Sequence, residues 1–180
     1  DEGSSIESYQ QAGFLPAAVF NYLCLLGWTP RAETEKLSRD DLVSLFDAKD
    51  IHSSNARFDI GKCTWLNSQY LRELEPAALL EAARPHLSQA GLPIEKASRA
   101  SAILQSVKEK VSLLSEFPAW VHYFFRDDYP YEVEVVAKLR AKEENSTLLE
   151  AAATALEGVD DWTEDSIHAA IDIAAKDQGV

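Results

Sequence analysis

The sequence contains no methionine. Translation begins with methionine, so we expect this chain to be a processed form or a piece of a longer protein. It also lacks an apolar run of the roughly 18 residues that a membrane helix needs. The longest candidate, residues 14–28, is interrupted by Pro16 and Asn21. The first residues have neither the basic stretch nor the apolar core of a signal peptide, so we expect a cytoplasmic protein with no membrane partner.

Cysteine is scarce, with only Cys24 and Cys63, and each lies in an apolar, helix-like run. A disulfide framework needs more cysteines and a loop-rich pattern, so we predict two buried thiols. Catalytic signatures are missing too: there is no glycine-rich phosphate loop, GxSxG, HExxH or CxxC. The four histidines share no metal-ligand spacing. We therefore predict no catalytic residue and no metal site, and keep a metal-dependent enzyme using either cysteine as the weakest hypothesis.

The net charge of −13 is unevenly distributed. Residues 1–126 hold 16 acidic and 13 basic side chains, whereas residues 127–180 hold 14 acidic and 4 basic ones. Phosphate affinity comes from lysine and arginine, so the overall charge argues mildly against RNA as a partner. If RNA is bound, we expect the contact surface in the first two-thirds of the chain.

Helical spacing of apolar residues runs through the chain, and no pair of strands is evident, so we predict an all-α fold. Ser38 followed by Asp41 matches a capping box, and Asp59 and Thr163 are further candidate helix caps. Gly13 suits a helix end. The segment from Pro16 is apolar on nearly all sides, which predicts a buried core helix. The expected helices begin after Ser5 and cover about 16–26, 39–46, 60–71, 75–89, 93–114, a segment from Pro118, 132–142, 147–157 and 164–177.

Four basic side chains fall in the predicted helix 93–114. Lys96, Arg99 and Lys110 lie within about 60° of one another along one edge of its apolar stripe, and Lys108 lies on the opposite edge. A line of cations beside a groove is what contact with RNA phosphates needs. Taken alone, the pattern is more typical of the solvated flanks of an amphipathic helix.

An aromatic group follows this helix. Trp120, Tyr123, Phe124 and Phe125 could stack unpaired bases, as aromatic side chains do in RNA-binding proteins. Their helical spacing favours a place in the core instead.

Three segments resemble glutamyl-tRNA synthetase of the bacterial type, a class I aminoacyl-tRNA synthetase. Gly13–Trp28 (GFLPAAVFNYLCLLGW) is similar to the helix that follows the family's lysine–serine signature loop. Phe58–Leu71 (FDIGKCTWLNSQYL) resembles its FDxxKLxWLNxxYI stretch, and Lys108–Leu114 (KEKVSLL) resembles its KERxxxL helix. The resemblance covers essentially the whole chain. It implies helical subdomains: a stem-contact part at 1–74, a first anticodon-binding subdomain at 75–128, and part of a second at 129–180.

The resemblance also implies a function. The parent enzyme would attach glutamate to tRNA using ATP and Mg, and this non-catalytic chain would hold the anticodon arm and inner stem. The expected partners are glutamate-accepting tRNA and the missing catalytic domain of the same chain, in a monomer. Lys110 stands where the family commonly has arginine, and lysine cannot reproduce arginine's planar fork, so phosphate contact is expected there. The tRNA-binding residues that we predict are Lys62, Asn67, Tyr70, Lys96, Arg99, Lys108 and Lys110. The alternative function is an acidic helical protein-interaction module that uses an exposed aromatic patch.

Overall fold

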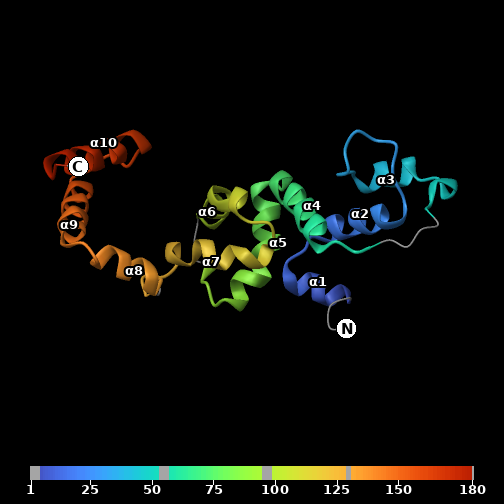
Figure 1. The fold of residues 1–180 in the computed structure, drawn as a ribbon, viewed down its shortest axis with the longest axis horizontal. Helices are drawn as coiled ribbons and strands as arrows, with labels where there is room; N and C mark the ends of the chain where they lie inside the picture. Colours follow the sequence, from blue (N-terminus) through green and yellow to red (C-terminus); the bar gives the residue numbers. More distant parts are fainter. Residues whose placement is uncertain (1–4, 53–56, 95–98, 129–130, 180) are drawn as a thin grey trace. The chain divides into compact units, whose positions relative to one another are not determined.

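The computed structural model describes residues 5–52, 57–94, 99–128 and 131–179, and over these ranges the fold is all-α, as predicted (Figure 1). The described residues contain no β-strand, only an isolated bridge between Trp28 and Ile51. None of the described helices is both long and apolar enough to cross a bilayer. The α-helices are α1 (Ile6–Ala12), α2 (Pro16–Gly27), α3 (Arg39–Leu45), α4 (Ile60–Glu73), α5 (Pro76–Gln89), α6 (Ala100–Val107), α7 (Phe117–Val121), α8 (Val133–Arg140), α9 (Glu143–Glu157) and α10 (Glu164–Asp177).

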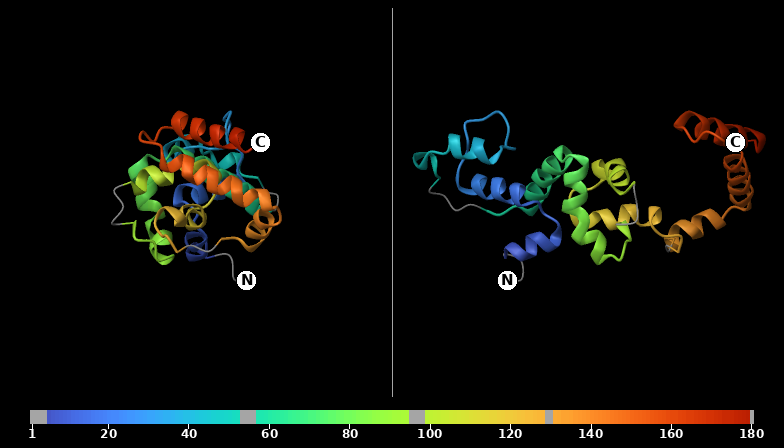
Figure 2. Two further views of the ribbon diagram at one scale, coloured as in Figure 1. Left: turned by 90° about the vertical axis from the view of Figure 1, so that its left-hand side faces the viewer. Right: turned by 180° about the vertical axis from the view of Figure 1, so that it is seen from behind.

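The chain divides into two compact units, Asp1–Tyr129 and Pro130–Val180. In the first unit α6 and α7 pack against α5, and α4 packs against α2 (Figure 2). The largest group of buried apolar side chains joins these elements and includes Leu71, Leu79 and Phe117. Burying each such side chain contributes roughly 1.5–3 kcal/mol. The predicted stem-contact and anticodon-binding parts therefore share one core, and the boundaries at residues 74 and 128 stay predictions.

Side-chain caps begin several of these helices where the sequence predicts them. Ser38 Oγ accepts from the backbone N–H of Asp41 at 3.1 Å, and the Asp41 carboxylate accepts from Ser38 N at 3.2 Å. Asp59 Oδ1 accepts from Lys62 N at 3.1 Å at the start of α4. These caps satisfy N–H groups that have no partner inside a helix, and each is worth about 1 kcal/mol.

The prediction that α2 is buried on nearly all sides is wrong. Ala18, Asn21 and Tyr22 are buried, whereas the side chains of Phe20 and Leu23 are exposed. The reason is that α2 packs mainly on α4 and α3, which leaves one apolar face of the helix open.

The prediction of one long helix over 93–114 is also wrong. Residues 95–98 lie outside the described ranges, α6 ends at Val107, and Lys108–Lys110 form a 3₁₀ turn, η3. Val111 then has an extended backbone, with φ −117° and ψ 147°. The Glu116 carboxylate accepts from Ser112 N at 2.7 Å and so replaces a helical partner. Val111 and Leu114 both enter the core beyond this break.

The second unit consists of α8, α9 and α10. Of its described side chains only Ala174 is buried, so this unit has little core of its own. Thr163 caps α10 as predicted, since its hydroxyl accepts from Ser166 N at 3.3 Å. α9 and α10 pack against each other.

Gly13 is the residue at which the first helix depends most on the absence of a side chain. Its φ is +89°, and an added Cβ would lie 2.8 Å from Leu114 N and closer still to Ser115 N. We expect Gly13→Ala to lower the free energy of unfolding by about 3 kcal/mol or more, because the left-handed backbone and the backbone contact both resist it. Urea unfolding measures this.

Gly91 provides the matched control. Its φ is +69°, but nothing lies within 4 Å of the added Cβ. Gly91→Ala should therefore cost only the conformational term, roughly 1–2 kcal/mol. If the free energy of unfolding falls equally in the two variants, the close contact between Gly13 and the backbone of residues 114–115 does not contribute to stability.

Candidate nucleic-acid interface

Asn67, on α4, connects three separate parts of the first unit. Its side-chain oxygen accepts from Leu15 N at 2.7 Å, and its side-chain NH₂ donates to the Ser112 carbonyl at 2.6 Å. The side chain is completely buried. This amide therefore fixes the start of α2 against α4, and fixes both against the segment that directly follows Lys108–Lys110.

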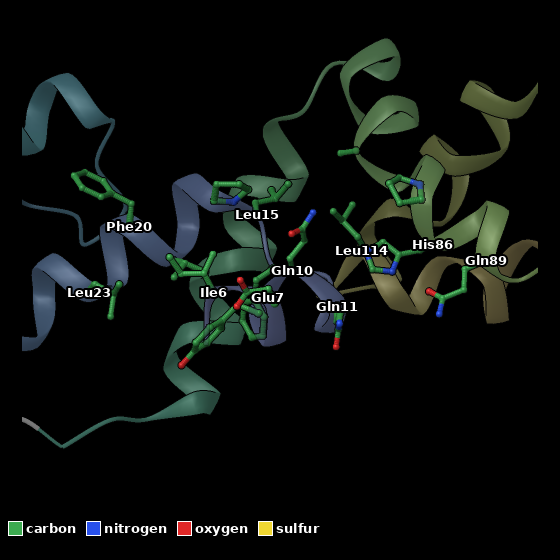
Figure 3. Close-up of a pocket in the computed structure, with 16 residues that line it drawn as sticks. Ile6, Glu7, Gln10, Gln11, Leu15, Phe20, Leu23, His86, Gln89 and Leu114 are labelled. Atoms are coloured by element: carbon green, nitrogen blue, oxygen red, sulfur yellow. The ribbon is translucent and has the colours of Figure 1, made fainter. Parts of the chain in front are cut away.

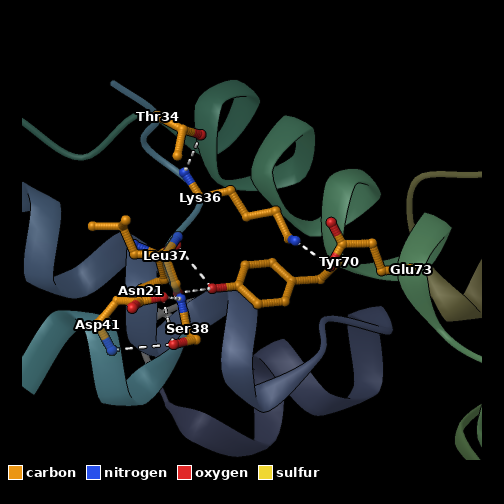
Figure 4. Close-up of polar contacts among 8 residues, drawn as sticks. All are labelled: Asn21, Thr34, Lys36, Leu37, Ser38, Asp41, Tyr70 and Glu73. Carbon is orange, nitrogen blue, oxygen red and sulfur yellow. Dashed lines mark hydrogen bonds and ion pairs between the residues drawn. The ribbon is translucent and has the colours of Figure 1, made fainter. Parts of the chain in front are cut away.

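A second polar network surrounds Tyr70, three residues further along α4 (Figure 4). The Tyr70 hydroxyl lies 2.5 Å from the Leu37 carbonyl and 2.9 Å from Asn21 Oδ1, which also accepts from Leu37 N. Lys36 lies over the Tyr70 ring at 5.2 Å and pairs with Glu73. Burial, followed by nearby carboxylates, raises the pKa of Tyr70 to about 12. Tyr70 therefore stays neutral and holds the loop before α3 against α4.

These hydrogen bonds show how two of the predicted tRNA-binding residues are used within the fold. Asn67 is inaccessible, and the Tyr70 hydroxyl is used inside the fold, so neither side chain offers its polar atoms to RNA in this structure. Both act as residues that shape the surface. Lys62 differs, because it is half-exposed and pairs with Glu35 at 2.6 Å. Such a surface pair contributes less than about 1 kcal/mol, so a phosphate can replace the carboxylate.

The predicted line of cations along one helix is not formed. Arg99 is exposed and precedes α6, whereas Lys108 and Lys110 lie in η3 beyond the far end of that helix. Lys96 lies outside the described residues. The eight residues of α6 separate its two ends by about 12 Å. Arg99 and Lys110 therefore cannot contact the same phosphate.

Lys108 and Lys110 are available for an anion. Lys108 Nζ donates to the Leu74 carbonyl at 3.3 Å, and Lys110 Nζ lies 5.1 Å from the centre of the Trp120 ring. Neither forms an ion pair with any side chain in the described ranges. Glu109, between them, pairs instead with Arg72 on α4 at 2.7 Å.

The aromatic group beside Lys110 is more exposed than the sequence predicts. The exposed fraction is 41% for Trp120, 45% for Tyr123 and 48% for Phe124, so a core role is wrong for these three. Phe125 does pack against the core. Phe117 and Val121, four residues apart, occupy the inner face of α7. This spacing is the feature of the sequence that indicates an outward position for Trp120.

An open groove of about 820 Å³ lies elsewhere in the first unit, between α1, α2 and α5 (Figure 3). Its walls are mostly apolar and include the exposed side chains of Ile6, Phe20 and Leu23. His86 also lines it, and partial burial lowers the pKa of this imidazole. The groove offers apolar contact area rather than a cluster of reactive groups.

The cysteines do not form a reactive or metal-binding site in the part of the chain that the structure describes. Cys63 is completely buried, and burial raises the pKa of its thiol to about 11. Cys24 is partly buried, and its pKa is raised for the same reason. A thiolate is the form that attacks electrophiles or binds metals, so both environments disfavour that chemistry. Within the described ranges no three His, Cys, Asp or Glu side chains come together as metal ligands.

A family model described as "Anticodon binding domain" matches residues 78–180, more than half of the chain. The chain belongs to this anticodon-binding domain family. A glutamate–tRNA ligase from Geobacillus stearothermophilus is 34% identical over 97% of this chain and 36% of that protein. One from Akkermansia muciniphila is 34% identical over 100% of this chain and 40% of that protein. A crystal structure of the Elizabethkingia meningosepticum ligase, in complex with its amino acid, matches with a TM-score of 0.82 and 25% identity over 96% of this chain and 34% of that one.

The chain thus spans little more than a third of the length of the ligases that it matches. The anticodon-binding match begins inside α5 and includes Arg99, Lys108, Lys110 and the exposed aromatics. Lys62, Asn67 and Tyr70 precede it. The two groups of predicted residues therefore belong to different parts of the chain, which Asn67 links through Ser112.

Tyr70→Phe tests the network in Figure 4. Removing the hydroxyl should lower the free energy of unfolding by about 1–2 kcal/mol at neutral pH, because the Leu37 carbonyl loses its donor. The unfolded pKa is near 10 and the folded pKa is about 12. The protonated hydroxyl therefore stabilises the fold fully below pH 10, and this contribution is lost as pH rises from 10 to 12. The free energy of unfolding, measured by urea denaturation, should fall less steeply between pH 10 and pH 12 in Tyr70→Phe than in the parent. An identical pH dependence in the two proteins would contradict the raised pKa of Tyr70.

Proposed function

We propose that this chain is the tRNA-binding part of a glutamate–tRNA ligase, and that it holds the anticodon arm and the inner stem of its tRNA. The match to the anticodon-binding domain family is the observation that carries this proposal. The similarity to glutamate–tRNA ligases over nearly the whole chain supports the choice of glutamate-accepting tRNA.

The basic side chains have different parts in this proposal. Lys108 and Lys110 contact phosphates of the anticodon arm, since neither pairs with a carboxylate among the described residues and both lie in η3. Arg99 contacts a phosphate further along the backbone. Lys62 exchanges Glu35 for a phosphate of the inner stem. Lys96 belongs to the same set on its sequence position alone.

The distribution of charge along the chain supports RNA binding at the first unit. Residues 127–180 carry a net charge of −10, which repels phosphate. Residues 1–126 carry only −3, and several of their acids are engaged internally, as Glu109 is with Arg72. RNA is therefore directed toward the first unit.

The reaction itself belongs, in this proposal, to the whole ligase: ATP, with Mg, activates glutamate before its transfer to tRNA. The residues described here offer no glycine-rich phosphate loop and no cluster of metal ligands, so we place ATP and Mg in the catalytic domain of the same cytoplasmic, monomeric protein. The isolated chain should not charge tRNA with glutamate. Accumulation of glutamyl-tRNA with the purified chain alone would contradict this.

The groove between α1, α2 and α5 favours a second candidate, a protein-interaction module. Its apolar walls could bury a partner's side chains. The two functions differ in their response to salt, because phosphate binding weakens steeply with ionic strength and apolar contact does not.

Binding of glutamate tRNA to the purified chain, measured by fluorescence anisotropy over a range of salt concentrations, tests the proposal. We expect log affinity to fall linearly with log salt, and Lys108→Gln and Lys110→Gln each to lower affinity and to make the slope shallower by about 0.7–0.9.

Lys138→Gln is the matched control, since Lys138 is an exposed lysine on α8 in the second unit. It should change neither affinity nor slope beyond about twofold. Absence of binding, or binding that does not depend on salt, would overturn the tRNA-binding proposal and favour the interaction module.

A further inference from the structure

We propose that Trp120 is a stacking platform for an unpaired base of the anticodon loop, with Tyr123 and Phe124 beside it and Lys110 contacting the phosphate that flanks the base. This proposal rests on the proposed function. It adds base stacking, which selects single-stranded RNA, to the phosphate contacts made by the basic side chains.

Exposure of the rings is the first support. The described residues bury most large apolar side chains of α5, α6 and α7, yet Trp120, Tyr123 and Phe124 each remain more than 40% exposed. The rings of Tyr123 and Phe124 lie 4.4 Å apart with an angle of 34° between their planes. Three neighbouring aromatic residues thus present ring surface at the end of the first unit. Bases stack on such surfaces with little regard to sequence, since every base has a π face.

The position of Lys110 is the second support. Its ammonium lies 5.1 Å from the centre of the Trp120 ring, within cation–π distance. A nucleotide that stacks on the indole carries its phosphate a few ångströms from its base, within reach of this long side chain. The side chain thus serves base and phosphate of the same nucleotide.

Three acidic side chains close to this cluster in the sequence form other contacts. Glu109 pairs with Arg72, and the Glu116 carboxylate accepts from the backbone N–H groups of Ser112 and Leu113 at 2.7 and 3.4 Å. Asp128 lies 3.8 Å from Arg126. With these three carboxylates engaged, the Lys110 ammonium beside the Trp120 ring can accept a phosphate, which favours a nucleic acid over an apolar protein segment as the occupant.

Trp120→Leu is the direct test, with an RNA hairpin that carries the anticodon loop of glutamate tRNA as the probe. Loss of one base–aromatic contact should weaken binding about 10-fold. Trp120→Phe, which keeps an aromatic plane, should lose less. Because no charge is removed, the salt slope should stay unchanged in both, whereas Lys110→Gln reduces it. RNA binding should also quench tryptophan fluorescence in the parent, and most of this quenching should be absent in Trp120→Phe.

Trp162→Leu is the matched control, because Trp162 is an exposed tryptophan in the second unit. It should bind the hairpin as the parent does. Circular dichroism and urea unfolding establish that each variant is folded. If the parent binds the hairpin and Trp120→Leu binds equally well, or if quenching persists in Trp120→Phe, the stacking contact is wrong while the tRNA-binding function stands. If the parent binds neither hairpin nor tRNA, the proposed function itself fails.

Discussion

The buried side-chain amide of Asn67 is the contact on which the arrangement of the first unit depends. Its two polar ends face a backbone N–H at Leu15 and a backbone carbonyl at Ser112, so the partners themselves fix which way the amide points. A buried backbone group that loses its partner costs about 1–3 kcal/mol, and Asn67 satisfies two. No apolar residue of similar size can do this. Through it, the segment that carries Lys108 and Lys110 is held at a defined place relative to α2 and α4.

Gly13 completes the same junction from the other side. The Gly13 carbonyl accepts from Leu114 N at 2.9 Å, and the Ser115 hydroxyl donates to the Ala12 carbonyl at 2.7 Å. The turn that ends α1 therefore lies directly against the segment that follows η3. Two residues with no reactive chemistry, a glycine and a buried asparagine, thereby determine where the cations and the exposed aromatics are placed.

Local features of the sequence predicted the helices well, because caps and turns are decided by neighbouring residues. Ser38 with Asp41 and Thr163 with Ser166 form the caps at the predicted places. The break after Val107 could not be predicted in this way. Val107, Val111 and Leu114 have helical spacing and are all buried, so the pattern fits one helix as well as a helix followed by an extended segment. The choice is made by Asn67 and Glu116, which supply the hydrogen bonds that a continued helix would have made.

The same reasoning explains why the candidate site was only partly predictable. Asn67 and Tyr70 match a family motif, but the motif does not distinguish a residue that touches RNA from one that shapes the surface. The hydrogen-bond partners make that distinction: both polar groups are used inside the fold, while Lys62 and Lys110 keep exchangeable contacts. In the proposed function, a chain with a net charge of −13 binds RNA because its structural contacts and its RNA contacts are made by different residues. Its rigid contacts are buried and uncharged, and its few available cations stand where acidic neighbours are already engaged. Local pairing, rather than total charge, therefore decides where such a protein can accept a phosphate.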